Sequence, residues 1–570
     1  MRRWAEIAEA VSGTTRTSHK AAILAEYLPS LDEASLPIAC VFLTGRLFAQ
    51  ADQRTIGLGW AAIRTAVGSV AGVDDDALGR AYDRYSDLGL AVADVLGSVG
   101  HVGATDGGPT IVEVADAFAT IERIATAGGK AEQLAQLLRR CDPPTAKFVT
   151  RLLGGELRIG LREGLLEAAI ARAYDRLLAD VKRAGMLTGD IGRTAALARD
   201  DRLAEATLEL FSPLKFMLAS PAEDAAEIVG RLGPIVWVED KYDGIRCQLH
   251  KLGPDVRLYS RDLHDVSAAF PEVVEEAAGL TFDGILDGEI LGWRDGTVLP
   301  FLALQSRLGR KAPSAAIRAN VPVVYVAFDL LAHGTSGGRV APLLEEPLSV
   351  RRRRLEDLKL PLVDDDGRFA LSHLDTADSP EALEIAFAGA RARRNEGLMV
   401  KDPDSPYSPG RRGLGWLKMK KALATIDCVV VGVEVGHGKR HGVLSDYTFA
   451  VRDEEADELV TIGKAYSGLT DAEIAEMTRF FETHTIRRLG RYRVVEPLVV
   501  VEIAFDVIMR SARHKSGFAL RFPRIVRLRT DKDPIQIDTL ATVEAIFRGL
   551  QAGSEHLVTA AARAVVPDAD

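Results

Sequence analysis

A single lysine, Lys241, stands between two acids and a glycine turn in "VEDKYDGIRCQ", residues 238–248. The residues before it, "GPIVW", have the apolar character of a buried strand. An amine at the end of such a strand becomes a nucleophile at neutral pH when desolvation or nearby cations lower its pKa from ~10.4 by ~3 units. Alternation puts Glu239 and Lys241 on one face, and a turn at "YDG" is expected to return Arg246 close to the lysine. The stretch therefore predicts either nucleophilic chemistry at Lys241 or a lysine paired with its flanking acids.

Other short runs carry residues suited to holding a nucleotide. Alternation in "GILDGEILGW" aligns Asp287 and Glu289 on one face, as a divalent cation or a ribose hydroxyl requires. The run "YVAFDLL" offers Phe328 as a flat surface for a base. The run "NEGLMVKDP" places Glu396 and Lys401 on either side of an apolar strand. Together these residues predict a site for base, ribose and phosphates around an amine.

Two basic segments extend this pattern toward polyanions. "GRRGLGWLKMKK" places Lys418 and Lys420 on one strand face, where two ammonium groups repel each other unless a polyanion lies between them. The segment 510–532 carries eight lysines and arginines against one acid, although the whole chain has a net charge of -10. This segment predicts a phosphate-binding face, the alternative being a solvated strand. By contrast, "RRRRLEDL", residues 351–358, is interpreted as the start of a solvated helix.

These motifs, in this order and at these distances, resemble those of the ATP-dependent DNA ligases, within the nucleotidyltransferases that include RNA ligases and capping enzymes. The resemblance rests on "EDKYDGIR", "YSRDLHDV", "LDGE", "VYVAFDLL", "EGLMVK", "WLKMKK" and "LRFPRIVRLRTDKDP". It covers residues from about 211 to 535, and "LLGGELRIGLREG" looks like the minor-groove-binding segment of larger ligases.

The resemblance implies ATP and Mg²⁺ as cofactors and a role for each matching residue. Lys241 would attack the α-phosphorus of ATP and become adenylated. Glu239 would select the adenine and Phe328 would stack on it. Glu289 and Glu396 would lie near the metal and the ribose. The residues expected to contact ribose or phosphates are Arg246, Arg261, Arg412, Lys418 and Lys420.

The resemblance also implies nicked double-stranded DNA as the partner. AMP would pass to the 5′-phosphate of a nick, and the neighbouring 3′-hydroxyl would displace it and seal the strand, in replication, repair or recombination. Arg521, Asp531 and Lys532 would belong to a lid that closes over ATP. The expected DNA contacts are Arg158, Lys439, Arg440, Arg521 and Arg524.

The elements that must position these residues change character along the chain. Residues 1–210 have helical periodicity, as in "VEVADAFATIERIATA" and "RLAEATLELF", and predict an all-α DNA-binding domain. Residues 211–421 have short β-type runs with helices between some of them, which predicts an α+β nucleotidyltransferase (adenylation) domain. Residues 422–548 have roughly five strands with glycine-rich turns, which suggests an OB-fold barrel, and residues 549–570 are expected to form a C-terminal tail.

Composition limits the remaining classes. The chain has 570 residues, 47% hydrophobic and 27% charged, without an apolar stretch of membrane-spanning length or a signal-peptide pattern at its start. We expect a cytoplasmic, nucleoid-associated monomer. Its four widely spaced cysteines, interpreted as buried thiols, do not form the zinc cluster of an NAD-dependent ligase. The sequence lacks a P-loop, and a helical first domain favours duplex DNA over the substrates of RNA ligases and capping enzymes. An inactive nick-binding protein remains the alternative from another class.

Overall fold

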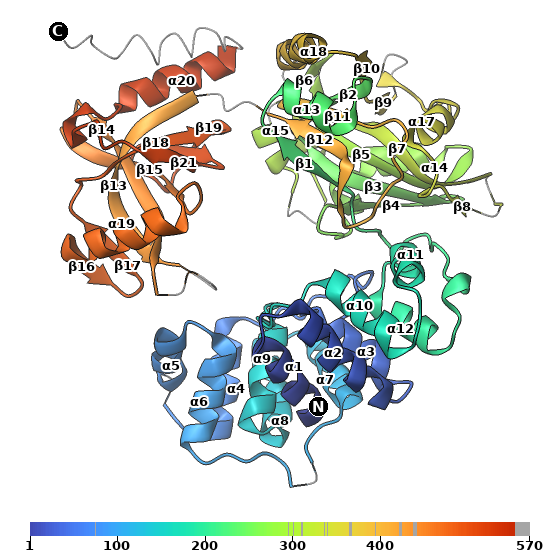
Figure 1. The fold of residues 1–570 in the computed structure, drawn as a ribbon, viewed down its shortest axis with the longest axis vertical. Helices are drawn as coiled ribbons and strands as arrows, with labels where there is room; N and C mark the ends of the chain where they lie inside the picture. Colours follow the sequence, from blue (N-terminus) through green and yellow to red (C-terminus); the bar gives the residue numbers. More distant parts are fainter. Residues whose placement is uncertain are drawn as a thin grey trace. The chain divides into compact units, whose positions relative to one another are not determined.

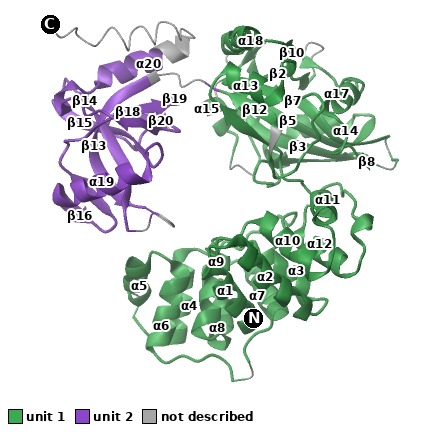
Figure 2. Ribbon diagram, in the orientation of Figure 1, with its two compact units in different colours: residues 1–419 green, residues 420–570 purple. Residues whose placement is uncertain are grey.

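The computed structural model describes residues 1–552 except 75, 106, 295, 300, 309–311, 336, 339, 364–366, 394, 421–423, 437–439 and 441 (Figure 1). The chain divides into two compact units, residues 1–419 and residues 420–570 (Figure 2). No helix within the described ranges has the length and apolar composition that a membrane crossing requires.

The first part of unit 1 is helical, as predicted. Amphipathic helices pack their apolar faces on a core that contains the edge-to-face aromatic rings of Trp4, Phe42, Phe118 and Phe148. The predicted helix at "RLAEATLELF" is wrong, because it is reduced to one 3-10 turn at Leu203–Glu205. The helices are α1 Arg2–Ser12, α2 Thr17–Tyr27, α3 Ser35–Leu43, α4 Trp60–Ala71, α5 Ala77–Tyr85, α6 Leu88–Ser98, α7 Ile111–Arg123, α8 Ala127–Arg140, α9 Pro143–Leu153, α10 Glu163–Ala173, α11 Leu178–Thr188 and α12 Ile191–Arg199.

The second part of unit 1 is built on two sheets. A five-stranded sheet has the order β1-β12-β11-β2-β10, and helices α13 (Ala225–Leu232) and α18 (Pro380–Ala392) pack on it. Its strands are β1 Leu218–Ala222, β2 Val236–Lys241, β10 Leu374–Ala377, β11 Gly397–Lys401 and β12 Arg412–Met419.

The other sheet follows the order β4-β3-β5-β7-β8, with β6 beside β5 and β9 beside β7. Helices α14 (Pro271–Ala278) and α17 (Leu348–Glu356) pack against it, while the short helices α15 (Phe301–Gln305) and α16 (Ala315–Asn320) lie between β6 and β7 in the chain. The strands are β3 Ile245–Leu252, β4 Asp255–Ser260, β5 Phe282–Arg294, β6 Thr297–Val298, β7 Val323–Thr335, β8 Ala341–Pro342 and β9 Phe369–Leu371. The predicted α+β class is confirmed.

The predicted turn at "YDG" joins two sheets, because β2 and β3 belong to different sheets and the chain crosses between them there. One local prediction in this region is wrong. The helix at "RRRRLEDL" is not solvated along its length, since Arg351 and Arg352 are buried. The Arg351 guanidinium donates to both carboxylate oxygens of Asp329, at 2.7 and 2.9 Å. The consecutive arginines predicted a solvent-exposed helix face because Asp329, the acid that pairs with Arg351, is distant in sequence.

Unit 2 is strand-rich, as an OB-fold domain requires. Its described residues form a seven-stranded sheet, a two-stranded ribbon and two helices, more strands than the five predicted. The sheet contains β13 Ala424–Val435, β14 Leu444–Asp453, β15 Glu458–Ala465, β16 Thr485–Leu489, β17 Tyr492–Val495, β18 Val500–Phe505 and β21 Arg524–Leu528. The ribbon is β19 Val507–Arg510 with β20 Phe518–Arg521, and the helices are α19 Asp471–Thr483 and α20 Leu540–Ala552.

Candidate active site and DNA-facing residues

Lys241 ends β2 and lies beside the start of β11. The Glu396 backbone N–H donates to the Lys241 carbonyl at 2.7 Å, and the Glu396 carboxylate forms an ion pair with the Lys241 ammonium. The lysine side chain is 20% exposed, so its amine is desolvated on one side but still open to a substrate. The structure thus brings together two residues that are distant in sequence and were both predicted for the site.

Gly244 sets the path of the chain after Lys241. A Cβ atom at this position would lie 2.4 Å from the Ile290 carbonyl oxygen and 2.9 Å from the Glu289 side chain, so the crossing from β2 to β3 requires glycine. The Gly244 N–H donates to Glu289 Oε1 at 3.2 Å. The glycine of the lysine motif therefore places Glu289 beside the nucleophile.

Glu289 is the carboxyl group whose titration is most altered in this site. Burial raises the pKa of Glu289 to about 7, while the positive charges of Lys241 and Arg246 oppose that shift. The carboxyl is therefore poised between its neutral and ionised forms at physiological pH, and a bound cation would favour the ionised form.

We expect Glu289→Gln to stabilise the protein at pH 8 but not at pH 4.5. Because the pKa of Glu289 is raised in the folded protein, this residue does not change the unfolding free energy while it is protonated in both the folded and the unfolded state. It lowers the unfolding free energy increasingly as pH rises from about 4.5 to about 7. At 1.36 kcal/mol per pKa unit the gain in unfolding free energy is about 3 kcal/mol above pH 7. Urea denaturation of both proteins at the two pH values checks this, and an equal difference at both values would contradict it.

Arg246 lies in an aromatic and acidic setting. Its guanidinium donates to both oxygens of Asp287, at 2.8 and 3.2 Å, and its charge lies 5.5 Å from the ring centroid of Phe328. The Tyr407 hydroxyl also donates to Asp287, at 2.7 Å. Asp287 therefore orients Arg246, and its oxygens already accept hydrogen bonds from Arg246 and Tyr407. Of the predicted pair, Glu289 is the acid available to a cation or a ribose hydroxyl.

Glu239 and Phe328 form the other wall of the site. The side chains of Glu239 and Asp240 point to opposite faces of β2. Glu239 pairs with Lys401 at 2.6 Å, whereas Asp240 pairs with Arg393 at 2.7 Å. Phe328, on β7, is nearly buried. The alternation predicted for the lysine strand is confirmed by these separate partners.

The remaining predicted phosphate-binding residues lie at strand ends and on one strand. Arg261 is exposed in the turn after β4, and Arg412 is exposed at the start of β12. Lys418 is half-buried on β12, opposite Met399 of β11. Lys420 follows the end of β12, belongs to unit 2, and pairs with Asp506 at 3.1 Å.

The residues present suit a hard cation that is shared with a substrate. Glu289 and Glu396 supply carboxylate oxygens near Lys241, which Mg²⁺ prefers. In the described part of the chain no group of three or more His, Cys, Asp or Glu residues could hold a metal alone. A bound Mg²⁺ would therefore take its other ligands from phosphates and water.

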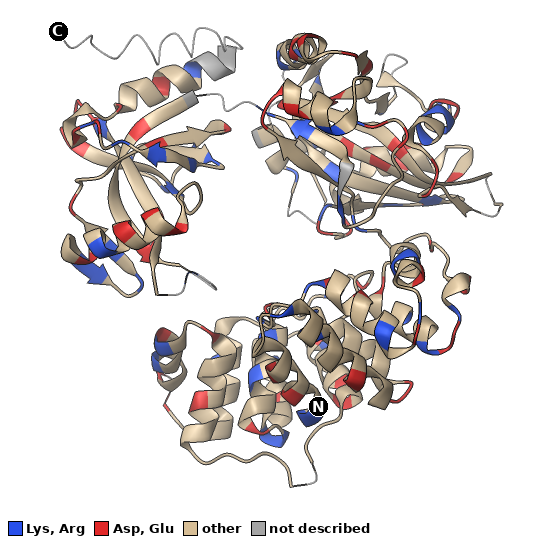
Figure 3. Ribbon diagram, in the orientation of Figure 1, with Lys and Arg blue, Asp and Glu red and all other residues tan. Residues whose placement is uncertain are grey.

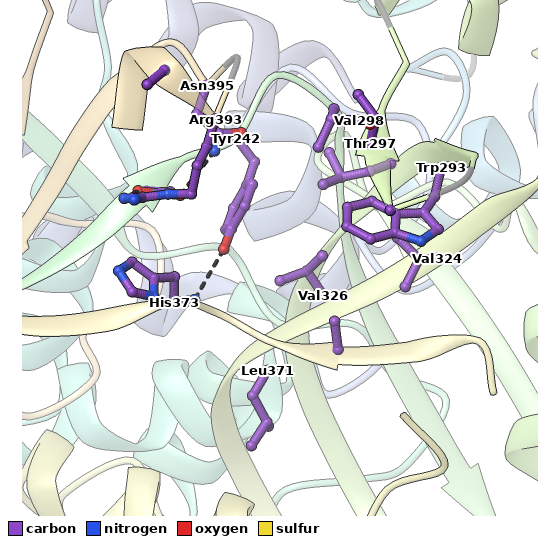
Figure 4. Close-up of a pocket in the computed structure, with 15 residues that line it drawn as sticks. Tyr242, Trp293, Thr297, Val298, Val324, Val326, Leu371, His373, Arg393 and Asn395 are labelled. Carbon is purple, nitrogen blue, oxygen red and sulfur yellow. Dashed lines mark hydrogen bonds and ion pairs between the residues drawn. The ribbon is translucent and has the colours of Figure 1, made fainter. Parts of the chain in front are cut away.

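A pocket of about 430 Å³ lies next to this site, beyond Tyr242 (Figure 4). Its walls include Trp293 and Val326, and its rim includes Arg393 and His373. The His373 backbone N–H donates to the Tyr242 hydroxyl at 3.0 Å. This bond holds the Tyr242 side chain in the wall of the pocket.

The predicted DNA contact of the helical region lies in the loop between α9 and α10. Arg158, at φ +56°, donates to Glu156 at 2.7 Å and to the Ser86 carbonyl at 3.0 Å. The Lys20 ammonium donates to the carbonyls of Ile159 and Gly160 from inside. The loop is thus held in shape from its buried side, while Arg158 remains partly exposed.

In unit 2 the predicted basic face is mixed with acids (Figure 3). Arg529 and Lys532 both pair with Asp427, at 2.8 and 2.7 Å, and Arg527 pairs with Glu502 at 2.7 Å. Of the residues expected to contact DNA in this unit, Arg524 is exposed on β21, Arg521 ends β20, and Arg440 donates to the Tyr466 carbonyl at 2.8 Å. Lys439 lies outside the described residues.

The sequence pattern includes Lys401 without assigning it a role of its own, and it does not indicate Trp416 or Tyr407. Lys401 and Trp416 stand at paired positions on β11 and β12. The alternation of "GLMVKD" could have indicated Lys401, because it puts Lys401 on the same face as Met399. Met399 is the residue paired with Glu239 on the neighbouring strand.

The chain is similar to known proteins along most of its length. Three family models match: DNA ligase N terminus over residues 1–171, ATP dependent DNA ligase domain over 216–420, and ATP dependent DNA ligase C terminal region over 440–532. A probable DNA ligase of Koribacter versatilis is 45% identical, covering 96% of both chains. One of Opitutus terrae is 44% identical over 98% of this chain, which spans only 63% of that relative. The solved structure Pmar-Lig_PreS3 has the same fold, with TM-score 0.59, 16% identity, and coverage of 92% and 99% of the two chains.

Proposed function

Because this chain belongs to the family of ATP-dependent DNA ligases, we propose that it seals nicks in duplex DNA through a lysine-AMP intermediate at Lys241. The observation that carries the proposal is the partly exposed Lys241 amine, held by Glu396 beside the half-buried Glu289. Binding alone has no need for an amine in this setting.

In the first step the neutral Lys241 Nζ attacks the α-phosphorus of ATP. A nitrogen–phosphorus bond forms, the bond from that phosphorus to the bridging oxygen breaks, and pyrophosphate leaves. The lysine must lose a proton, and the Glu396 carboxylate contacts the nitrogen that carries it. Glu396 thereby orients the amine toward the nucleotide.

The other side chains of the site would bind the nucleotide. Glu239 would accept a hydrogen bond from the adenine amine, and Phe328 would stack on the ring. Arg412, Lys418 and Lys420 would neutralise phosphate oxygens, and Arg246 and Arg261 would contact ribose or phosphate. Mg²⁺ held by Glu289 and Glu396 would stabilise the charge that develops on the phosphate oxygens.

In the later steps DNA replaces ATP as the reactant. The 5′-phosphate of the nick attacks the lysine-bound AMP, which frees Lys241 and forms a DNA-adenylate. The 3′-hydroxyl then attacks the activated phosphate, a phosphodiester bond forms, and AMP leaves. The first of these transfers moves a phosphorus from nitrogen to oxygen, and the second moves a phosphorus from one oxygen to another. In both, cations that are already in place would supply most of the catalysis.

The biological setting proposed is DNA replication, repair or recombination, by a monomer in the cytoplasm at the nucleoid. Nicked duplex would be held by basic side chains. Those proposed are Arg158, Lys439, Arg440, Arg521 and Arg524.

The proposal is tested by incubating the protein with α-labelled ATP and Mg²⁺ and then adding nicked duplex. We expect label on the protein band, followed by loss of that label as nicks close. If nicked DNA binds while neither ATP nor NAD labels the protein, the chain is a nick-binding protein instead.

Arg158→Ala is expected to weaken binding to nicked duplex about equally for all sequences. One phosphate contact contributes about one unit to the slope of log affinity against log salt, so the variant's slope should be shallower by about 1. Fluorescence anisotropy over a KCl series measures it. Arg80→Ala, which removes an exposed arginine paired with Asp74, is the control and should leave the slope unchanged.

A further inference from the structure

A buried lysine holds the acid that faces the proposed base site. Lys401 is 1% exposed, and its ammonium donates to Glu239 Oε2 at 2.6 Å. The same nitrogen lies 4.3 Å from the ring centroid of Trp416 and 4.7 Å from that of Phe328. Lys401 thus contacts both Glu239, which is expected to select the base, and the ring of Phe328, which is expected to stack on the base.

This arrangement gives the buried Glu239 carboxylate a cation partner and one fixed position. A carboxylate buried without a cation is protonated or moves toward water, whereas a paired one stays ionised and fixed. The aromatic faces add a favourable interaction with the ammonium and leave it little freedom to move away. An ionised carboxylate only accepts hydrogen bonds, while a protonated one can also donate.

We propose that Lys401 is a positioning residue that makes the site select 6-aminopurines and reject 6-oxopurines. The inference rests on the proposed function and names a determinant of its nucleotide specificity. The ion pair occupies Oε2 of Glu239 and leaves Oε1 to accept from the exocyclic amine of adenine. Guanine and hypoxanthine present an oxygen at that position, which a fixed carboxylate repels.

The test compares covalent labelling by α-labelled ATP and α-labelled ITP, because hypoxanthine differs from adenine in this edge and lacks the 2-amino group of guanine. The measured quantity is the ratio of kcat/KM values for the two nucleotides. Lys401→Met should lower this ratio at least about tenfold, since Glu239 then loses the cation that holds it in position. A role in folding alone would lower both rates and leave the ratio unchanged.

Lys251→Met is the matched control. Lys251 is also 1% exposed and pairs with a buried acid, Asp283, at 3.5 Å. Removal of Lys251, on β3, likewise leaves a buried carboxylate, that of Asp283 on β5, without its ammonium partner, and both residues lie outside the proposed base site. We expect this variant to lose stability and to keep the wild-type ratio.

The Glu239→Gln background shows whether Lys401 acts through Glu239. An amide both donates and accepts, so Glu239→Gln alone should lower the ratio, and adding Lys401→Met should change it by less than about twofold. If Lys401→Met does not fold alone, this double variant removes both charges together and is compared with Glu239→Gln.

The outcomes separate the two proposals. A wild-type protein that takes no label from ATP overturns the proposed function. A wild-type protein that labels, together with a Lys401→Met ratio equal to that of the wild type, overturns the assignment of Lys401 alone. A further fall of the ratio in the Glu239→Gln background also overturns it, because Lys401 would then act by another route.

Discussion

Lys241→Ala is expected to lower covalent labelling by α-labelled ATP at least about a thousandfold, since removal of a nucleophile leaves only the background provided by binding. The same variant should still seal a nick whose 5′-phosphate has been adenylated beforehand, because the last step does not use the lysine. The measurement is a denaturing gel for the first reaction and a ligation assay for the second. This pair of results isolates the role of Lys241 from any effect on DNA binding.

Lys241→Arg sharpens this test. Arginine keeps the positive charge beside Glu396 but does not deprotonate, so it should fail to label as fully as alanine does. Residual labelling of either variant at a tenth of the wild-type rate would mean that another residue is the nucleophile. Equal melting temperatures would show that the losses are chemical.

Local pattern was enough to predict much of the fold and of the site. Period-2 alternation placed Glu239 and Lys241 apart from Asp240, and the structure gives the two sets different partners. The change from helical to strand periodicity near residue 211 separated the helical part from the sheets. Such features depend on neighbours within a few residues, so they can be read from the sequence.

Features that depend on long-range pairing could not be predicted in this way. The Lys401–Glu239 ion pair joins residues 162 positions apart, and the partner of Arg351 is Asp329, in another element. The sequence predicted a turn at "YDG" but not a crossing between two sheets, because the lack of room for a Cβ atom at Gly244 comes from Ile290 on β5. In each case tertiary packing overrides a local preference.

Glu396→Gln is the second change expected to have a large effect. The Glu396 carboxylate contacts the Lys241 ammonium, and the β2–β11 ladder holds both backbones in register. Glutamine keeps the shape but loses the charge that orients the amine and that would bind Mg²⁺. We therefore expect the rate of lysine adenylation to fall by about 10²–10³, the range seen when one electrostatic partner of a reacting group is removed.

The two roles of Glu396 predict different dependences on Mg²⁺. If metal binding dominates, raising the Mg²⁺ concentration should recover part of the Glu396→Gln rate, whereas a role in orienting the amine gives a loss that Mg²⁺ does not recover. Glu381→Gln, on the exposed first turn of α18, is the control and should label at the wild-type rate. Wild-type labelling by Glu396→Gln at every Mg²⁺ concentration would mean that the ion pair with Lys241 is only a resting contact. Adenylation would then depend on Glu289, whose carboxyl feels the charge of Lys241, and Glu289→Gln would be the variant that loses the label.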